Sequence, residues 1–151
     1  MTYKDNNTLF ITDSKNQEIQ DIIKLLIKEK LPTEGVEKNI SNFLSLYIND
    51  KLIGTIGLEI YDNKGLLRSL VIDEFYQGKG YGKILCNKLF EKARQKKINE
   101  LFLLTETAPK FFLTIGFKKI PRESADEKVK TSDEFKSICP STAVCMQLKL
   151  S

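Results

Sequence analysis

The sequence contains no histidine among its 151 residues. This absence excludes nucleophilic triads of the Ser–His–Asp and Cys–His types, and it excludes histidine-ligated metal sites. A reaction that needs a general base must therefore take it from another side chain, and a carboxylate is the first alternative.

Cysteine is also scarce, with only Cys86, Cys139 and Cys145. An odd, low count predicts a reducing, cytoplasmic location, because the polar residues 1–7 also lack a signal-peptide hydrophobic region. Thiolates bind soft metalloids, but structural thiols are the favoured interpretation of all three cysteines, and no metal site is predicted. The longest apolar runs are far too short to span a bilayer, so no membrane partner is expected.

Charge of one sign is not concentrated anywhere in the chain. The formal net charge is +4, and the lysines are interleaved with 20 acidic residues. They are interpreted as solvated surface with a modest bias towards anionic ligands. No compact basic block with interleaved aromatic residues occurs, so no nucleic-acid partner is expected. The length and the hydrophobic content of 41% suit one globular domain, residues 1–151, with a sizeable core.

Hydrophobic periodicity predicts the order of strands and helices. Strands are expected at residues 9–12, 43–48, 52–61, 66–72, 101–105 and 143–150, with residues 117–120 extended. Helices are expected around residues 19–27, 33–40, 83–98 and 107–115, the last capped by Thr107. The charged residues 121–136 are expected to be loop-like and in part helical. The order βααβββαβαβ predicts one α/β (α+β) domain with a mixed, mostly antiparallel sheet and helices on both faces.

A glycine-rich segment lies between the apolar residues 66–72 and the amphipathic residues 83–98. Residues 77–82 read Gln-Gly-Lys-Gly-Tyr-Gly, so a strand ends, a turn intervenes and a helix begins. Glycine lets the main chain approach a ligand closely, and the first N–H groups of a helix attract anions. The segment lacks the P-loop string, and it has Gly-x-Gly-x-Gly where a dinucleotide fingerprint needs Gly-x-Gly-x-x-Gly. It is therefore either another kind of anion site or an ordinary glycine turn.

Two motifs resemble one known family, the GCN5-related N-acetyltransferases (GNAT). The string Gln-x-x-Gly-x-Gly at residues 77–82 resembles the family's acetyl-CoA signature, Arg/Gln-x-x-Gly-x-Gly/Ala. Residues 108–117, Ala-Pro-Lys-Phe-Phe-Leu-Thr-Ile-Gly-Phe, are similar to its Ala-x-x-Phe-Tyr-x-x-x-Gly-Phe segment. The element order matches as well, so the resemblance covers essentially the whole chain.

A narrower resemblance lies at four places, which are residues 31–33, 57–59, 66–70 and 139–143. Together they look like the arsenic-resistance N-acetyltransferase branch, which is similar to small amino-acid N-acetyltransferases of the N-acetylglutamate synthase type. The resemblance suggests an amino-acid-like acceptor, with organoarsenical or phosphinic amino acids among the candidates.

The resemblance implies acetyl-CoA as cosubstrate, with its pyrophosphate on the main-chain N–H groups of the loop. The residues of that loop are Gln77, Gly78, Lys79, Gly80, Tyr81, Gly82 and Lys83. Leu70, Val71 and Ile72 match the strand whose main chain pairs with the pantetheine, and Phe111 of the second motif is also placed at the cofactor. This strand is expected to splay from residues 101–105, so that a main-chain N–H such as that of Ile72 polarises the thioester carbonyl.

The reaction that the resemblance implies is direct attack of a free amine on the thioester carbon. Glu59, late in a central strand, is the first candidate for the general base, and a solvated glutamate is the alternative. Glu106 is the second candidate for the general base. The alternative is that Glu106 is an acidic residue at the start of a helix, where it interacts with the helix dipole. Phe112 stands where many relatives have a tyrosine that acts as the general acid, and phenylalanine has no proton to donate. Either Tyr81, Thr105 or a water therefore protonates the CoA thiolate, or the thiolate leaves without protonation.

Arg68 is the best candidate for acceptor binding. A guanidinium inside an apolar strand needs a partner when it is buried. The partner is either a substrate carboxylate, held bidentately, or an acid such as Glu59 across the sheet. Ser69 and Thr105 are expected to offer hydroxyls to the same pocket.

These observations predict an N-acetyltransferase acting on a small amino acid or amino-acid-like toxin. Acetylation of a protein or peptide amine is the alternative within the class. A non-catalytic acyl-CoA sensor is the alternative from another class, favoured by the missing histidine and by Phe112. A homodimer is expected by analogy with the family.

Overall fold

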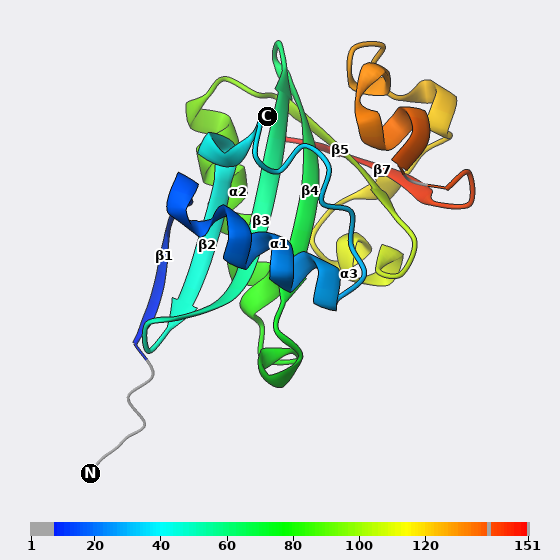
Figure 1. The fold of residues 1–151 in the computed structure, drawn as a ribbon. Helices are drawn as coiled ribbons and strands as arrows, with labels where there is room; N and C mark the ends of the chain where they lie inside the picture. The colour runs from blue at the N-terminus through cyan, green and yellow to red at the C-terminus, as the bar shows by residue number, and fades with distance from the viewer. Residues whose placement is uncertain (1–7, 139, 151) are drawn as a thin grey trace. The chain divides into compact units, whose positions relative to one another are not determined.

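The structure, a computed structural model, describes residues 8–138 and 140–150 (Figure 1). The described residues form a seven-stranded sheet in the order β1-β2-β3-β4-β5-β7-β6. The strands are β1 (Leu9–Asp13), β2 (Phe43–Ile48), β3 (Lys51–Tyr61), β4 (Lys64–Ile72), β5 (Glu100–Thr105), β6 (Lys118–Lys119) and β7 (Val144–Lys149). The α-helices are α1 (Ile19–Lys28), α2 (Tyr81–Gln95) and α3 (Pro109–Thr114).

The sheet is mixed and mostly antiparallel, as the sequence predicts. β1 with β2, β2 with β3, β5 with β7 and β6 with β7 are antiparallel, whereas β4 and β5 are parallel. The turn between β2 and β3 has Asn49 and Asp50 at φ 50° and 68°. Positive φ at both central residues belongs to the two-residue hairpin turns that match strand twist.

The chain divides into two compact units. The first comprises Met1–Gly57 and Ser69–Asn87, and the second comprises Leu58–Arg68 and Lys88–Ser151. The strands β3 and β4 pass from one unit into the other. The glycine-rich loop therefore belongs to the first unit, and the Glu59 and Arg68 side chains belong to the second.

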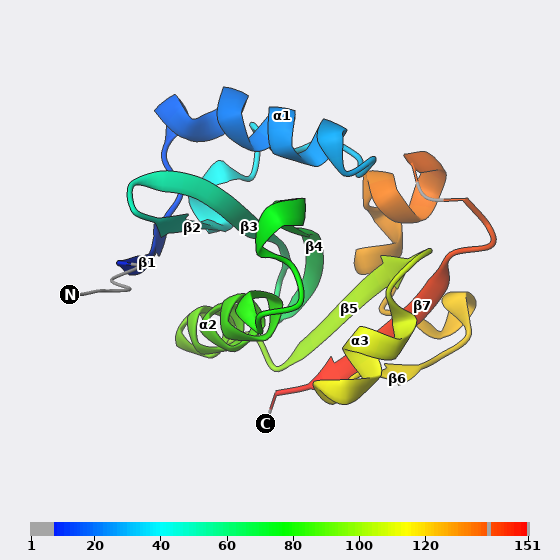
Figure 2. The ribbon, with the colours of Figure 1, turned by 90° about the horizontal axis from the view of Figure 1, so that it is seen from below.

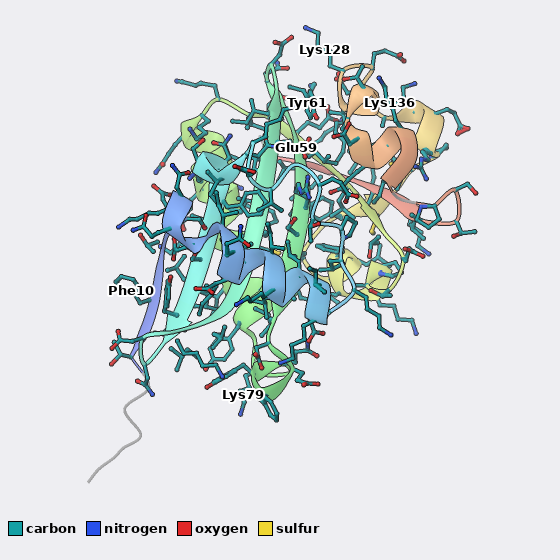
Figure 3. The ribbon with its side chains drawn as sticks, in the orientation of Figure 1. Phe10, Glu59, Tyr61, Lys79, Lys128 and Lys136 are labelled. Atoms are coloured by element: carbon teal, nitrogen blue, oxygen red, sulfur yellow. The ribbon has the colours of Figure 1, made fainter. Side chains whose placement is uncertain are left out.

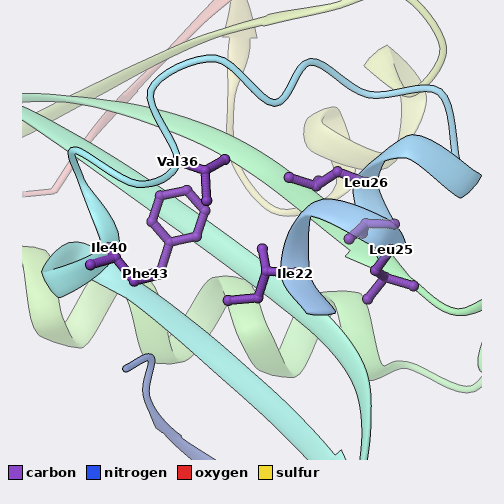
Figure 4. Packing of buried hydrophobic residues seen from close by; sticks show 7 residues of the cluster. Ile22, Leu25, Leu26, Val36, Ile40 and Phe43 are labelled. Carbon is purple, nitrogen blue, oxygen red and sulfur yellow. The ribbon is translucent and has the colours of Figure 1, made fainter. Parts of the chain in front are cut away.

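The core of the first unit forms where α1 packs on the strands (Figure 4). Its buried members are Ile22, Leu25, Leu26, Val36, Ile40, Phe43 and Val71. Each such side chain contributes about 1.5–3 kcal/mol by leaving water. α1 and the start of α2 lie on opposite sides of β2 and β3 (Figure 2), in line with the prediction of helices on both faces. Ile27, expected on the apolar stripe, is 62% exposed.

The predicted helix over residues 33–40 is wrong. Residues 34–39 form consecutive turns that end in the short 3-10 helix η3 (Ile40–Asn42). Gly35 has φ 85°, which lies outside the right-handed helical region. The apolar Val36 and Ile40 of this segment are nevertheless buried against α1, so it contributes to the core without regular helix.

The core of the second unit forms between the charged segment and the strands β5 and β7. Its buried members are Leu66, Phe102, Ala125, Val129, Phe135 and Cys145. The segment contains the short helices η5 (Arg122–Ser124), η6 (Val129–Thr131) and the π-helix η7 (Glu134–Ile138). The prediction of a partly helical loop is thus confirmed, and the segment's apolar residues fix it to the sheet.

The predicted cap of α3 is wrong. Ala108 is the N-cap residue and makes no side-chain cap bond, and Pro109 occupies the first helical position. The hydroxyl Oγ1 of Thr105 instead accepts a hydrogen bond of 3.1 Å from the Ala108 N–H. The end of β5 therefore holds the start of α3, a role that the sequence pattern assigned to Thr107.

Candidate functional site

The glycine-rich loop begins where β4 ends, and its first residues are fixed by side chains. The Asp73 N–H donates to the Ile53 carbonyl at 2.7 Å, and Asp73 Oδ1 accepts from the Phe75 N–H at 3.0 Å. The Gln77 side chain then turns back, and its Nε2 donates to the Ile72 carbonyl at 2.8 Å. The glutamine of the motif therefore ties the loop to the strand end.

Two glycines give the loop its shape. Gly78 and Gly80 have φ 79° and 89°, a region that side chains rarely adopt. A Cβ on either would meet no heavy atom within 4 Å, so backbone conformation and not crowding requires glycine here. The open space leaves the loop's main chain accessible to a ligand.

The loop leads directly into α2, and the first N–H groups of this helix lack acceptors within the helix. The Ile84 N–H donates to the Gly80 carbonyl at 3.2 Å, which is the first bond of the helix. The N–H groups of Tyr81, Gly82 and Lys83 precede that bond and so lack intrahelical acceptors. Lys79, at the tip of the loop in Figure 3, and Lys83 are both exposed. The loop thus combines main-chain donors, a helix dipole and positive charge, which together suit a phosphate-bearing ligand.

The carboxyl end of α1 supports this loop in the first unit. Lys28 Nζ lies 3.4 Å from Asp73 Oδ2 and 3.6 Å from Glu74 Oε1. The hydrogen bond from the Phe75 N–H and the nearby Lys28 charge lower the pKa of Asp73, although burial opposes them. Asp73 is therefore ionised at neutral pH and holds the loop entrance through both its oxygens.

In the second unit, β3 and β4 bring the predicted Glu59 and Arg68 together. Arg68 is only 3% exposed, and its Nη1 lies 2.6 Å from Glu59 Oε2. The other carboxylate oxygen of Glu59 accepts a hydrogen bond of 2.5 Å from the Tyr61 hydroxyl. Arg68 Nε lies 3.3 Å from Glu134 Oε2 at the start of η7. The ion pair that the sequence left open as an alternative for Arg68 is present.

Tyr61 and Glu134 were missed by sequence reasoning. Tyr61 follows Glu59 by two residues in β3, so the two side chains share a face of the strand. That spacing could have identified it. Glu134 stands among many charged residues of its segment, and no local pattern distinguishes the one acid that is buried.

Tyr61 serves as a hydrogen-bond donor in this cluster. Burial, and then the hydrogen bond to Glu59, raise the pKa of the Tyr61 phenol above its ordinary value. The hydroxyl therefore keeps its proton across the neutral range. Glu59 is consequently held at both oxygens by donors, and it still has further lone pairs because a carboxylate offers about four acceptor positions.

β4 departs from regular geometry next to Arg68. Ser69 has φ 59°, an unusual value for a residue with a side chain inside a strand. The parallel register between β4 and β5 covers Lys64–Leu66 and Glu100–Phe102, so Arg68 lies beyond the paired part. Leu70 is half-buried, whereas the Val71 and Ile72 side chains are buried in the core, as the sequence predicts.

Other predicted residues lie outside the cluster around Arg68. Glu106 is exposed after the end of β5 and is not among the described partners of Glu59. Thr105 uses its hydroxyl to accept from Ala108. Phe111 is half-buried, with its ring centroid 5.2 Å from that of Phe112, and Phe112 packs on Phe117 at 5.6 Å. Phe112 thus has a packing role in place of the tyrosine that many relatives carry.

The described cysteines behave as structural thiols. Cys86 and Cys145 are buried and free, and burial raises their pKa values to about 12 and about 11. Cys139 lies outside the described residues. Within residues 8–138 and 140–150, no three acidic, cysteine or histidine side chains converge as a metal site. None of the helices described is long and apolar enough to cross a membrane.

Comparison with known proteins agrees with this geometry. The Acetyltransferase (GNAT) family profile matches residues 11–117. An uncharacterized N-acetyltransferase of Chlorobaculum tepidum is 26% identical over 122 residues, which cover 80% of this chain and 76% of that protein. An acetyltransferase of the GNAT family from Staphylococcus aureus has a TM-score of 0.78 and 18% identity, covering 95% of this chain and 100% of that one.

A further solved structure is N-acetylglutamate synthase from Neisseria gonorrhoeae, complexed with coenzyme A and N-acetyl-glutamate. It has a TM-score of 0.83 and 22% identity over 97% of this chain, which spans 36% of the Neisseria protein. The family match covers more than half of the chain and includes the glycine-rich loop and α3. The chain belongs to the Acetyltransferase (GNAT) family and is an acetyl-CoA-dependent N-acetyltransferase of that type.

Proposed function

We propose that the protein acetylates the α-amine of a small amino acid or of an amino-acid-like compound. The observation that carries this proposal is the buried Arg68, which lies in an apolar strand between the carboxylates of Glu59 and Glu134. A guanidinium fixed in this way is pre-organised to hold a carboxylate in a bidentate manner. The same cluster supplies a carboxylate, Glu59, for proton transfer.

In this proposal the loop from Gln77 to Lys83 holds the pyrophosphate of acetyl-CoA. The donors are the main-chain N–H groups at the start of α2, and Lys79 and Lys83 add positive charge. The main chain of β4 from Leu70 to Ile72 pairs with the pantetheine. Acetyl-CoA supplies the activated acetyl group, and the protein supplies position and proton transfer.

The proposed chemistry is direct transfer. A bond forms between the acceptor nitrogen and the thioester carbon, the C–S bond breaks, and the electron pair leaves with sulfur. One proton of the acceptor ammonium goes to a free lone pair of Glu59, directly or through water, before the nitrogen attacks. The second proton, which the nitrogen loses once the new bond has formed, goes through solvent to the departing thiolate. General-base assistance of this kind contributes about a hundredfold or more. Tyr61 keeps its proton and fixes the orientation of Glu59 throughout.

One further observation supports a carboxylate-bearing acceptor. The Neisseria N-acetylglutamate synthase, whose fold this chain shares, is complexed with N-acetyl-glutamate, an acetylated amino acid. Organoarsenical and phosphinic amino acids carry an α-amine beside an acidic group, so they fall in the same acceptor class. Cysteine usage supports a cytoplasmic location, and family analogy supports a homodimer of this single domain.

A non-catalytic acyl-CoA sensor is the second candidate. Phe112 is buried among aromatic rings, so it offers no proton to a leaving thiolate. A sensor would keep the glycine-rich loop and dispense with proton transfer. The buried cluster of Glu59, Arg68 and Glu134 favours the enzyme. Burying three charged side chains has a high desolvation cost, and a protein that only binds acyl-CoA does not need them.

The experiment that tests the proposal is acetyl-CoA turnover against a panel of amino acids, amino-acid toxins, simple amines and peptides, with products identified by mass spectrometry. Acetylation of one α-amine on a carboxylate-bearing small molecule would support the proposal. Acetylation of peptides alone, or acetyl-CoA binding without any product, would overturn it and favour the protein acetyltransferase or the sensor, respectively.

A further inference from the structure

The two carboxylates that neutralise Arg68 do so with unequal geometry. Glu59 Oε2 lies 2.6 Å from Nη1, a short charge-assisted hydrogen bond. Glu134 Oε2 lies 3.3 Å from Nε, beyond the usual length of such a bond. Glu59 is also fixed by the Tyr61 hydroxyl at its second oxygen. Of these two contacts with the guanidinium, the one to Glu134 is the longer.

The setting of Glu134 suits a side chain that exchanges partners. It is the first residue of η7, and single π turns occur frequently at functional sites. The neighbouring main chain is fixed, because Arg122 Nη2 donates to the Phe135 carbonyl at 3.0 Å and Nη1 donates to the Pro140 carbonyl at 2.8 Å. Phe135 itself is buried in the core. The position of this segment is thus fixed by contacts other than the one between Glu134 and Arg68.

Charge decides what happens when an acceptor carboxylate reaches Arg68. Glu59 and Glu134 already give the guanidinium two negative partners in a buried setting. A third carboxylate beside them would be strongly repelled, because charges interact strongly where water is excluded. The charges therefore favour binding of an acceptor carboxylate together with departure of one resident carboxylate.

We propose that Glu134 is a specificity-determining residue that occupies the acceptor-carboxylate position on Arg68 until the acceptor displaces it. This inference rests on the proposed function and narrows its acceptor class. An acceptor must carry an anionic carboxylate or a similar oxyanion beside its amine. A carboxamide or a simple amine has no negative charge to replace that of Glu134. Glu134 therefore stays on the guanidinium when such a compound is present.

The test is the acceptor KM of the Glu134→Gln variant. Gln is nearly isosteric, and it leaves Arg68 and Glu59 as a balanced pair of charges, so folding should be retained. Suppose that Glu134 is displaced from the Arg68 guanidinium in about a tenth of the wild-type molecules. Removing this competing carboxylate then lowers the KM for a carboxylate acceptor about tenfold. The KM for the corresponding carboxamide should stay within about twofold of the wild type. A KM for the carboxylate acceptor that is unchanged or higher would overturn the inference, as would equal changes for both acceptors.

Glu127→Gln provides the matched control, because Glu127 lies on the same segment but is exposed and pairs with Lys130 at 2.9 Å. Its KM values should equal those of the wild type. If Glu134→Gln does not fold, as judged by thermal unfolding, the wild type still tests the inference. Simple carboxylates should then compete with the acceptor, and their amides should not; equal inhibition by both would overturn it. If the wild type acetylates no carboxylate-bearing amine, the proposed function itself is wrong. If the wild type is active but Glu134→Gln shows no decrease in the acceptor KM, only the role of Glu134 is wrong.

Discussion

The hydroxyl of Tyr61 and the carboxylate of Glu59 form a hydrogen bond of 2.5 Å between side chains two residues apart in β3. The opposite oxygen of Glu59 accepts from Arg68 at 2.6 Å. Glu59 is thus oriented by a neutral donor and by a charged donor at once. Together they fix the direction in which the carboxylate points, and a general base must be positioned before it can take a proton.

Replacing Tyr61 with Phe should slow the reaction. The substitution removes the hydroxyl that donates to Glu59 Oε1 at 2.5 Å, so the carboxylate is no longer held in one orientation. We expect kcat at neutral pH to fall about tenfold if Glu59 is the base, while the acetyl-CoA KM stays nearly constant. The measurement is steady-state kinetics of both proteins with each substrate varied in turn.

The same Tyr61→Phe variant should also lose about 1–2 kcal/mol of stability, because one hydrogen bond to a charged group is removed. Tyr76→Phe is the control, since that phenol lies in the first unit at η4 (Glu74–Tyr76) and contacts Lys51 through its ring, which phenylalanine retains. A kcat of Tyr61→Phe equal to that of the wild type would show that holding Glu59 by the Tyr61 hydroxyl does not contribute to the reaction.

Replacing Arg68 with Lys should separate acceptor binding from cofactor binding. Lysine keeps a positive charge near Glu59 but lacks the planar fork needed for bidentate contact. We expect the acceptor KM to rise tenfold or more, by about 1.4 kcal/mol for each factor of ten, while the acetyl-CoA KM stays nearly constant. Steady-state kinetics with each substrate varied in turn provides the measurement.

Arg68→Ala is a poorer probe of binding than Arg68→Lys because it leaves two buried carboxylates without their cation. Breaking a buried ion pair in this way costs about 3–5 kcal/mol of stability. An Arg68→Lys enzyme with the wild-type acceptor KM would indicate that Arg68 has only a structural role.

Sequence reasoning located the fold and the loop better than the polar cluster. The glycine-rich loop and the order of strands depend on neighbours in sequence, so local patterns predicted them. The ion pair of Arg68 with Glu134 joins residues far apart in the chain, and its formation depends on how the charged segment packs through Phe135 and Val129. The predicted helix at residues 33–40 failed for a related reason, because burial of Val36 and Ile40 needs no helix.

Replacing Gly80 with Asp should abolish binding of CoA while the protein remains folded. Gly80 has φ 89°, so any side chain adds about 1–2 kcal/mol of backbone strain, and a carboxylate there would also repel the phosphates. Gly80→Ala introduces the strain without the charge and is the matched control. Binding of CoA by calorimetry should be weakened in Gly80→Ala and lost in Gly80→Asp. Retained binding in Gly80→Asp would mean that the loop does not hold the pyrophosphate.

Acid should weaken the entrance of the loop through Asp73, whose pKa is lowered in the folded protein. A lowered folded-state pKa means that the stabilisation is fully present above the unfolded value, about 4, and is lost as the pH falls through the folded value. Asp73→Asn keeps an acceptor for the Phe75 N–H but cannot ionise, so its Tm should lie below that of the wild type at neutral pH and fall less on acidification.

Asp73→Ala removes the acceptor as well and should lose about 1 kcal/mol at neutral pH, because the short helix η4 then lacks its cap. Thermal unfolding of the three proteins from pH 7 down to pH 3 separates the two contributions. If wild type and Asp73→Asn lose Tm in parallel, the ionised Asp73 makes no contribution to acid sensitivity, and the ion pair with Lys28 at 3.4 Å is worth nothing measurable. A steeper decrease in the wild type would instead assign that stabilisation to the charge of Asp73 and connect the stability of α1 with the geometry of the loop.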